Sequence, residues 1–155
     1  LDKQKIRYLV AGGFAVNFHQ VQRATVDLDL ILHIEKTNIL KFVAIMKELG
    51  FKPRVPVKAE DFAEDSIREK WIREKGMMVF TFIHSSNHLE VIDIFNREPI
   101  PFDTMWDSRL DVKAFGFTIP VIGKQHLIEL KRQANREKDR FDIEQLKKTW
   151  LGHSR

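Results

Sequence analysis

The sequence predicts a single α+β domain, in which a mixed β-sheet is flanked by helices and two further helices finish the chain. Three observations predict it. The 155 residues, 43% of them apolar, suffice for one hydrophobic core. Strand-like apolar runs alternate with segments of helical spacing, and one pair of runs reads as a hairpin. No internal repeat or Pro/Gly/Ser-rich linker divides the chain, so residues 1–155 are treated as one domain.

The composition excludes several classes of protein. Without any cysteine, the chain has no disulfide scaffold, no zinc ribbon and no thiol nucleophile, which fits a reducing compartment. No stretch approaches the roughly twenty apolar residues of a membrane span, and residues 1–6 carry charges where a signal peptide is apolar. We therefore expect a cytoplasmic protein without membrane contact.

The first part of the chain is predicted to form a strand, a turn, a helix and a second strand. Residues 6–11 form a short apolar run, Gly12 and Gly13 form a turn, and residues 14–21 have helical character. Residues 27–34 begin with alternating acidic and apolar side chains and contain two β-branched isoleucines, which predicts a second strand.

A helix follows, with Thr37 or Asn38 as its cap and Gly50 at its end. Residues 51–57 contain two prolines and read as a connection. In residues 58–75, charged side chains dominate, but apolar ones recur at three- and four-residue steps, which predicts one exposed amphipathic helix.

The second half begins with a hairpin, in which residues 77–83 and 89–95 are the strands around a polar turn. A short irregular or helical piece ends near Asp107, and one strand is expected around residues 112–119. Residues 124–136 and 141–150 finish the chain as two helices.

The charge excess lies at the C-terminal end. The chain carries a net charge of +4, and from residue 124 onward nine basic side chains face five acidic ones, whereas the two signs balance before it. Such a basic block attracts phosphates, or it is an ordinary solvated helical face.

Asp27 and Asp29 are the first candidates for chemistry. In a strand, residues i and i+2 point to the same face, so both carboxylates project together while Leu28 and Leu30 face the core. Two adjacent carboxylates repel each other unless they are exposed or a cation bridges them, and hard oxygen ligands suit Mg²⁺. The pair is therefore either a metal site or two solvent-facing acids at a sheet edge.

Gly12 and Gly13 stand where a predicted strand passes into a predicted helix. Backbone N–H groups at such a turn can approach a phosphate closely, although a Gly-Gly pair is also a common plain turn. Arg23 lies between this turn and the Asp27–Asp29 strand. The combination of apolar strand, Gly-Gly turn, helix and Asp-x-Asp strand is far more specific than its parts.

These motifs resemble those of the nucleotidyltransferase superfamily with the DNA polymerase β-like fold. Residues 10–16 (Val-Ala-Gly-Gly-Phe-Ala-Val) and 23–30 (Arg-Ala-Thr-Val-Asp-Leu-Asp-Leu) are similar to its glycine turn and Asp-x-Asp strand. Residues 91–95 (Val-Ile-Asp-Ile-Phe) are similar to its third-carboxylate strand, and residues 127–143 to its Lys-x-x-Ala…Arg-x-Lys-Asp-x-x-Asp helix pair. Within the superfamily, the chain looks most like AbiEii-type toxins and minimal nucleotidyltransferases.

The resemblance implies transfer of a nucleoside monophosphate from a nucleoside triphosphate to an acceptor hydroxyl, with release of pyrophosphate. It implies that Asp27, Asp29 and Asp93 hold two Mg²⁺ ions, a division of labour that suits an in-line displacement. It also implies that Gly12 and Gly13 cradle the triphosphate. In the same way it implies that Lys131, and less strongly Arg23, add positive charge to the phosphates.

Some residue roles stay open at this point. Periodicity in residues 89–95 does not choose between Asp93 and Glu90 as the third carboxylate; the resemblance favours Asp93. Lys131 is either a phosphate ligand or an ordinary surface lysine. Asp139 and Asp142 either cap the last helix or take part in the site.

The expected activity is Mg²⁺-dependent nucleotidyl transfer, whose acceptor is RNA, a small hydroxyl compound or a protein hydroxyl. The basic C-terminal block tilts the expectation slightly toward an RNA acceptor, or simply toward binding of the triphosphate. The alternative is a catalytically silent member of the same fold that binds a nucleotide or a partner, for example as half of a toxin–antitoxin pair with an antitoxin as the partner.

Overall fold

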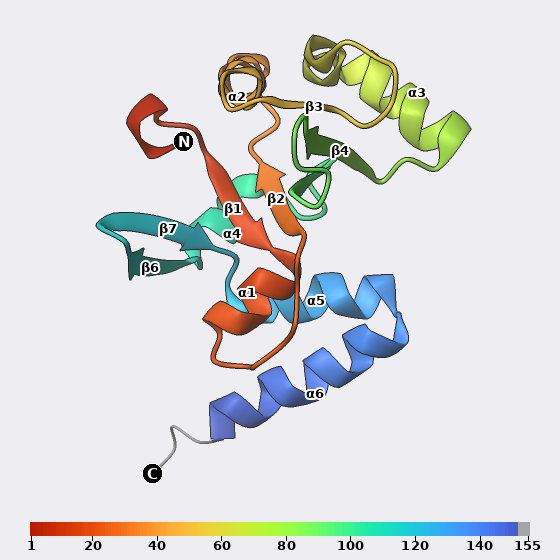
Figure 1. The fold of residues 1–155 in the computed structure, drawn as a ribbon. Helices are drawn as coiled ribbons and strands as arrows, with labels where there is room; N and C mark the ends of the chain where they lie inside the picture. Colours follow the sequence, from red (N-terminus) through yellow and green to blue (C-terminus); the bar gives the residue numbers. More distant parts are fainter. Residues whose placement is uncertain (152–155) are drawn as a thin grey trace.

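The computed structural model describes the backbone of residues 1–151 and the side chains of residues 1–149. Arg155 of the basic block and the last four residues of the predicted domain lie outside the described part. Within it, a mixed sheet runs through the middle of the molecule, with helices on either side (Figure 1).

Seven strands form one sheet in the order β3-β4-β5-β2-β1-β7-β6. The β2–β5 and β1–β7 pairs are parallel and the other four are antiparallel, so the predicted mixed sheet is confirmed. The strands are β1 (Tyr8–Ala11), β2 (Leu28–Leu32), β3 (Phe51–Pro53), β4 (Val79–His84), β5 (Val91–Phe95), β6 (Leu110–Ala114) and β7 (Phe117–Val121).

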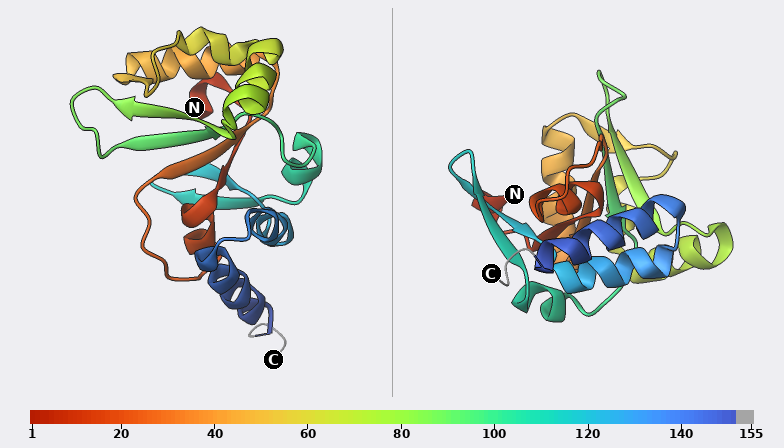
Figure 2. Two further views of the ribbon diagram at one scale, coloured as in Figure 1. Left: turned by 90° about the vertical axis from the view of Figure 1, so that its right-hand side faces the viewer. Right: turned by 90° about the horizontal axis from the view of Figure 1, so that it is seen from below.

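The helices gather in two groups. Helices α2 and α3 lie together at one end of the molecule, and α5 and α6 pack against each other at the other end, near α1 (Figures 1 and 2). The helices are η1 (Asp2–Gln4), α1 (Gly12–Phe18), α2 (Lys36–Glu48), η2 (Ala59–Ala63), α3 (Asp65–Lys75), α4 (Phe102–Asp107), α5 (Lys124–Ala134) and α6 (Glu137–Leu151), with η1 and η2 being 3-10 helices. None of the helices in the described part is long and apolar enough to cross a membrane.

An aromatic cluster fills one face of the sheet. Phe80 stacks on Phe62 and on Trp71, and Phe82 packs edge-to-face against Phe42 and Phe80. Phe80 and Phe82 belong to β4, and their side chains are fully buried beneath the helical layer. Because side chains alternate along a strand, the residues between them point to the opposite face. The packing of the core therefore dictates which side chains are free to form a site.

Several predicted elements are confirmed: the first strand, the hairpin of residues 77–95, the short helix before Asp107 and the two C-terminal helices. The cap of α2 was predicted wrongly. The Glu35 side chain accepts hydrogen bonds from the N–H groups of Thr37 and Asn38, at 3.0 Å each. Asn38 is buried instead, where it bridges the backbone of Arg7 and His33.

Three further segments differ from the prediction. Residues 51–57 are not only a connection, since β3 pairs with β4 at the sheet edge. Residues 58–75 are not one helix, because the extended backbone of Glu64 separates η2 from α3. This break lets Phe62 and Trp71 both stack on the ring of Phe80. The amphipathic pattern of the sequence does not predict this arrangement.

The single strand predicted around residues 112–119 is in fact the β6–β7 hairpin. Its two-residue turn has Phe115 at φ 52° and Gly116 at φ 76°, the left-handed pair of a type I′ turn. The Asn-Gly or Asp-Gly signal of such turns is missing, since Phe115 occupies the first position. The apolar pattern of the sequence therefore continues through the turn, and nothing in it indicates that one strand ends and another begins.

Replacing Phe115 by Asn is expected to raise the free energy of unfolding by roughly 0.5–1 kcal/mol. Its side chain is 96% exposed and packs on nothing that the change removes, while Asn tolerates the left-handed backbone better. Urea denaturation of the variant and the wild type measures the difference. An unchanged or lower midpoint would show that Phe115 carries no backbone cost.

Candidate active site

One row of side chains crosses the sheet on the face opposite the aromatic cluster. Asp93 on β5 lies beside Asp29 on β2, with Thr81 on its other side and Ala11 beyond Asp29. The neighbouring row of Phe80, Ile94 and Leu30 is buried on the other face. The strand register therefore brings together two carboxylates that are far apart in the sequence.

The two carboxylates of this row have different surroundings. Thr81 Oγ1 donates a hydrogen bond of 2.5 Å to Asp93 Oδ1, which fixes that carboxylate. The Asp29 carboxylate receives no hydrogen bond and forms no ion pair among residues 1–149, whose side chains are described. The oxygens of the Asp29 carboxylate are thus left to bind a ligand or water.

Asp27 and Glu90 lie apart from this row. Asp27 comes just before β2, not within it as predicted, and its side chain is exposed. It is nevertheless close enough to Asp29 to raise the pKa of that carboxyl. Glu90 is exposed in the β4–β5 turn, where it accepts a hydrogen bond of 2.8 Å from Asn87. Of the two alternatives for a third carboxylate, only Asp93 adjoins Asp29.

Burial raises the pKa of Asp29 to about 6, and the neighbouring charges of Asp93 and Asp27 act in the same direction. The positive charges of Arg136 and Lys131 oppose this without cancelling it. A half-buried carboxylate among like charges gains stability from a bound cation, as a metal ligand does.

Gly12 lies directly against Asp29. Its φ of +60° is a left-handed conformation, and a Cβ built on it would clash with Asp29 Oδ2. Gly13 is buried under Thr25, whose Oγ1 would lie 2.6 Å from an added Cβ. Gly12 and Gly13 open α1, which spans Gly12–Phe18, instead of forming the separate turn predicted before a helix at residues 14–21. As the first residues of this helix, they give the carboxylate room, in addition to any contact with a phosphate.

Gly12→Ala is expected to lower the free energy of unfolding by at least about 1–2 kcal/mol, the cost of a left-handed alanine, and to push the Asp29 carboxylate out of place. Gly76→Ala is the matched control, because Gly76 has φ +59° but open space around its Cβ. Urea denaturation and a nucleotidyl-transfer assay compare the two variants. Equal behaviour would show that contact with Asp29 is unimportant.

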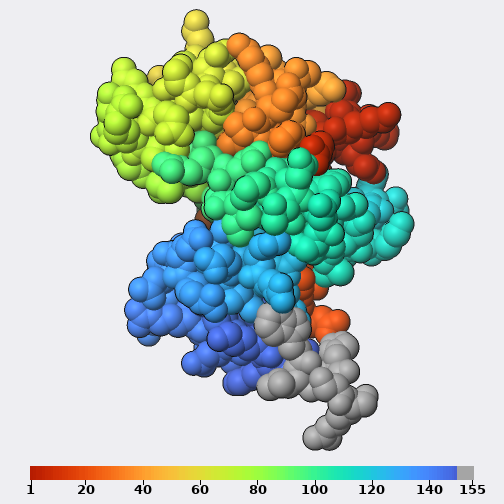
Figure 3. Space-filling model, turned by 180° about the vertical axis from the view of Figure 1, so that it is seen from behind, coloured from red at the N-terminus to blue at the C-terminus, as the bar shows by residue number. Residues whose placement is uncertain are grey.

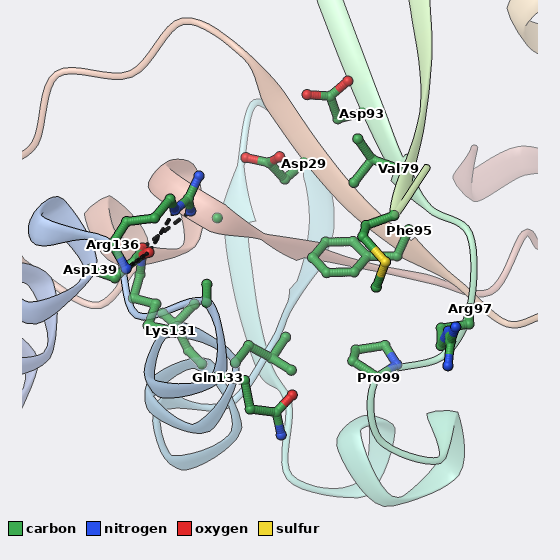
Figure 4. Close-up of a pocket in the computed structure, with 15 residues that line it drawn as sticks. Asp29, Val79, Asp93, Phe95, Arg97, Pro99, Lys131, Gln133, Arg136 and Asp139 are labelled. Atoms are coloured by element: carbon green, nitrogen blue, oxygen red, sulfur yellow. Dashed lines mark hydrogen bonds and ion pairs between the residues drawn. The ribbon is translucent and has the colours of Figure 1, made fainter. Parts of the chain in front are cut away.

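A cleft of about 730 Å³ opens in front of Asp29 and Asp93. The space-filling view shows the molecule notched between the green segments and light-blue α5 (Figure 3). Figure 4 shows a polar side, with Asp29, Asp93, Arg136 and Asp139, and a second side with Val79, Phe95 and Pro99. The other lining residues include Gly12, Met78, Arg97, Leu127, Leu130, Lys131 and Gln133. The cleft can therefore hold a ligand with one charged and one apolar part.

Lys131 and Arg23 are bound to acidic residues of α6. Lys131 is buried, with its Nζ 2.8 Å from Asp142 and 3.3 Å from Asp139. Arg23 Nη1 donates to the same Asp142 at 2.7 Å. Lys131 is thus no ordinary surface lysine. Arg23 does not line the cleft, whereas Lys131 does, beneath its polar side.

Asp139 and Asp142 are both buried. Asp139 accepts a backbone hydrogen bond from Arg136 at the start of α6, as a capping acid does, and it also lines the cleft. Burial alone would raise its pKa, but the Arg136 hydrogen bond and the charges of Arg136 and Lys131 hold the pKa below its ordinary value. The expected capping role and a place beside the site thus coexist in one residue.

Arg136 is a residue of the cleft to which the sequence had assigned no role. Its Nε lies 2.6 Å from Asp139 Oδ2, yet the side chain is 60% exposed and borders the cleft beside Asp29 (Figure 4). The hydrogen bond to Asp139 raises the pKa of Arg136. In the sequence it appeared as a member of the basic block and as the arginine of the Arg-x-Lys-Asp-x-x-Asp motif, but spacing alone does not tell which cation of a helix pair faces a cleft.

The donor set suits Mg²⁺ in part. Asp29 and Asp93 supply adjacent carboxylate oxygens, and the raised pKa of Asp29 marks a place that favours a cation. Among the described residues, no three acidic or histidine side chains are already gathered as a metal cluster. Asp27, exposed before β2, is the third acid of this region.

Comparison with known proteins places the fold. No protein-family profile matches the chain, and no curated protein matches it in sequence. The fold is similar to that of lincosamide antibiotic adenylyltransferase LnuA in its lincomycin-bound structure, at a TM-score of 0.61 and 19% identity, covering 94% of this chain and 89% of that one.

Two further solved structures agree. ANT(2")-Ia, in complex with adenylyl-2"-tobramycin, gives a TM-score of 0.59 at 14% identity, with 97% of this chain and 82% of that chain covered. A nucleotidyltransferase described for Thermotoga maritima, TM1012, gives 0.57 at 12% identity, with 98% and 86% covered. The chain has the nucleotidyltransferase fold, as its Gly-Gly turn and acidic strand had indicated.

Proposed function

We propose that the protein is a Mg²⁺-dependent nucleotidyltransferase, which moves a nucleoside monophosphate from a nucleoside triphosphate to an acceptor hydroxyl. The observation that carries this proposal is the row in which Asp29 and Asp93 lie side by side, with Gly12 against Asp29 and an open cleft in front. A domain that only binds a partner has no use for a half-buried acid pair held in repulsion. The fold shared with nucleotidyltransferases supports the same proposed function.

In the proposed reaction, the acceptor oxygen forms a bond to the α-phosphorus of the triphosphate. The bond from that phosphorus to the bridging oxygen breaks, pyrophosphate leaves, and the hydroxyl proton passes to water. Bound Mg²⁺ would supply charge neutralisation and a lowered pKa for the attacking hydroxyl. Two ions are proposed, as the resemblance implies.

The residues of the chain would divide the work by position. Asp29 and Asp93 would hold the metal, with Asp93 oriented by Thr81, and Asp27 would complete the ligands of the second ion from the edge of β2. Arg136 would direct its exposed guanidinium at the phosphates. Gly12 and Gly13 would let the triphosphate approach the backbone.

For the acceptor, we propose a small hydroxyl compound rather than RNA. Part of the basic block, which had tilted the expectation toward RNA, is engaged within the C-terminal helices: Lys131 pairs with Asp139 and Asp142, and Arg132 with Glu129. The cleft has an apolar side formed by residues such as Phe95 and Pro99, which suits a compact partly apolar molecule. Two of the solved structures named above are bound to small molecules, lincomycin in one and the adenylylated compound adenylyl-2"-tobramycin in the other.

The test incubates the protein and Mg²⁺ with each nucleoside triphosphate, labelled in separate reactions at the α- or the γ-phosphate. The acceptors are a panel of small polyhydroxyl compounds, total RNA, and the protein itself. Transfer of the α-label to a small compound, with the γ-label released as pyrophosphate, is the expected result. Release of the γ-label as inorganic phosphate would indicate a phosphohydrolase instead.

The other acceptors are outcomes of the same assay. Label on RNA would favour the AbiEii-type alternative, in which the protein is a toxin with an antitoxin partner. Label on a protein would favour a protein-modifying enzyme. Nucleotide binding without any transfer would favour the catalytically silent alternative and overturn the proposal.

A further inference from the structure

The outer edge of β6 is a free border of the sheet. Strand β6 ends the strand order and, within residues 1–151, pairs only with β7; Figure 1 shows it at the margin of the molecule. Three large apolar side chains around it are exposed: Leu110 and Phe117, and Phe115 at the hairpin tip. An edge of this kind offers unpaired backbone groups to another strand unless something protects it.

The hairpin geometry fixes which backbone groups point outward. In a two-residue hairpin, the pair that flanks the turn is hydrogen-bonded, and here that pair is Ala114 and Phe117. Since bonded and non-bonded pairs alternate, the backbone groups of Asp111 and Lys113 point away from β7. Pro120 opposite Asp111 agrees with this, because a proline has no N–H to offer there.

A second β6 fits this edge when it runs antiparallel with Val112 at the centre. Asp111 of each copy then lies opposite Lys113 of the other, and both residues direct their N–H and C=O groups toward the partner. Their side chains share one face of the sheet, so two Asp–Lys pairs form across the twofold axis. On the other face, Leu110 of each copy lies opposite Ala114 and near Phe117 of its partner.

The neighbouring registers are unfavourable. Shifting the centre to residue 111 places Asp111 against Asp111, and shifting it to residue 113 places Lys113 against Lys113. An intermediate register places backbone N–H and C=O groups that point outward on one β6 opposite groups that point toward β7 on the other. The hydrogen bonds between the two strands are then lost. The charge pattern of β6 therefore accepts one self-pairing and rejects the alternatives.

We propose that β6 is a homodimerisation edge, through which two copies of the chain join their sheets around Val112. The pairing surface of a five-residue strand is at the small end of specific interfaces, so the dimer dissociates on dilution. The twofold symmetry closes the assembly at two copies, because each β6 edge is used once.

Charge exchange tests this register by sedimentation equilibrium, from low micromolar to near-millimolar concentration. The wild type is expected to rise reversibly from 18.3 kDa to twice that mass. Asp111→Lys and Lys113→Asp are each expected to stay monomeric, because like charges then face each other. An equimolar mixture of these two variants is expected to form a heterodimer, and the doubly exchanged chain is expected to regain the homodimer.

Two controls separate register from general charge and from folding. Lys52→Asp changes an exposed lysine on β3 at the opposite sheet edge and is expected to dimerise like the wild type. Asp111→Lys also removes the Arg109–Asp111 ion pair, so circular dichroism and urea midpoints verify that each variant is folded. A wild type that remains monomeric at every concentration, single variants that associate normally, or a mixture that stays monomeric would each overturn the proposal.

Discussion

Replacing Asp29 by Asn is expected to abolish nucleotidyl transfer and, at neutral pH, to stabilise the fold. A metal ligand supplies several kcal/mol of transition-state stabilisation, so its loss reduces the rate by at least about a thousandfold. The stability rises because burial and the charges of Asp93 and Asp27 disfavour the Asp29 carboxylate, whose pKa lies at about 6. Keeping that charge costs roughly 1–3 kcal/mol at neutral pH, which the amide avoids.

The effect of Asp29 on the free energy of unfolding changes with pH in a definite direction. The folded pKa of Asp29 lies above its ordinary value of 3.8, so the folded state binds more protons than the unfolded state between these two values. Stability due to this group is therefore present at low pH and is lost as the pH rises through about 6. Urea denaturation in chelator from pH 4 to 8 should find Asp29→Asn and wild type equal at the acid end and apart at the neutral end.

Asp27→Asn is the control for this comparison, because Asp27 is exposed and contributes less to the repulsion. It should shift stability by less than about 0.5 kcal/mol, as for most surface changes. If Asp29→Asn destabilised the protein at pH 7, or if it retained full transfer activity, the proposed place of Asp29 at the centre of the site would be wrong.

Replacing Lys131 by Met is expected to cost about 3–5 kcal/mol of unfolding free energy, the usual cost of breaking a buried ion pair. Lys131, Asp139 and Asp142 are all buried, and removal of the ammonium leaves two carboxylates to Arg136 and Arg23 alone. Lys138→Met on the exposed face of α6 is the matched control, with an expected change within about 0.5 kcal/mol.

The Lys131 result distinguishes two roles. The sequence resemblance implies a phosphate-binding lysine, whereas the contacts describe a residue that joins α5 to α6. A Lys131→Met variant that stays as stable as the wild type but loses transfer would assign the residue to the phosphates. A large loss of stability, measured by urea denaturation, would assign it to the helix pair first.

Much of the site could be predicted because its motifs are local. The first strand, the two glycines and the acidic strand follow each other between Tyr8 and Leu32, and their order indicated the fold. Asp29 and Gly12 therefore lie where the sequence pattern suggested, in direct contact. The limits of β2 were less predictable, since Asp27 has the same alternation as the strand but lies just outside it.

The rest could not be predicted because it depends on non-local pairing and on burial. Periodicity left Asp93 and Glu90 equal and the preference for Asp93 rested on the resemblance alone, whereas the parallel register of β2 with β5 places Asp93 beside Asp29. Likewise, the positive charges of α5 and α6 have similar spacing. Tertiary packing alone decides that Lys131 is buried in ion pairs while Arg136 faces the cleft.

Manganese binding, followed by the loss of the free Mn²⁺ signal in electron paramagnetic resonance, tests the central claim most directly. With a non-hydrolysable triphosphate present, the wild type should bind Mn²⁺, and Asp29→Asn and Asp93→Asn should each lose that binding while remaining folded. Unchanged Mn²⁺ binding in both variants would contradict the assignment of these two carboxylates as the metal site.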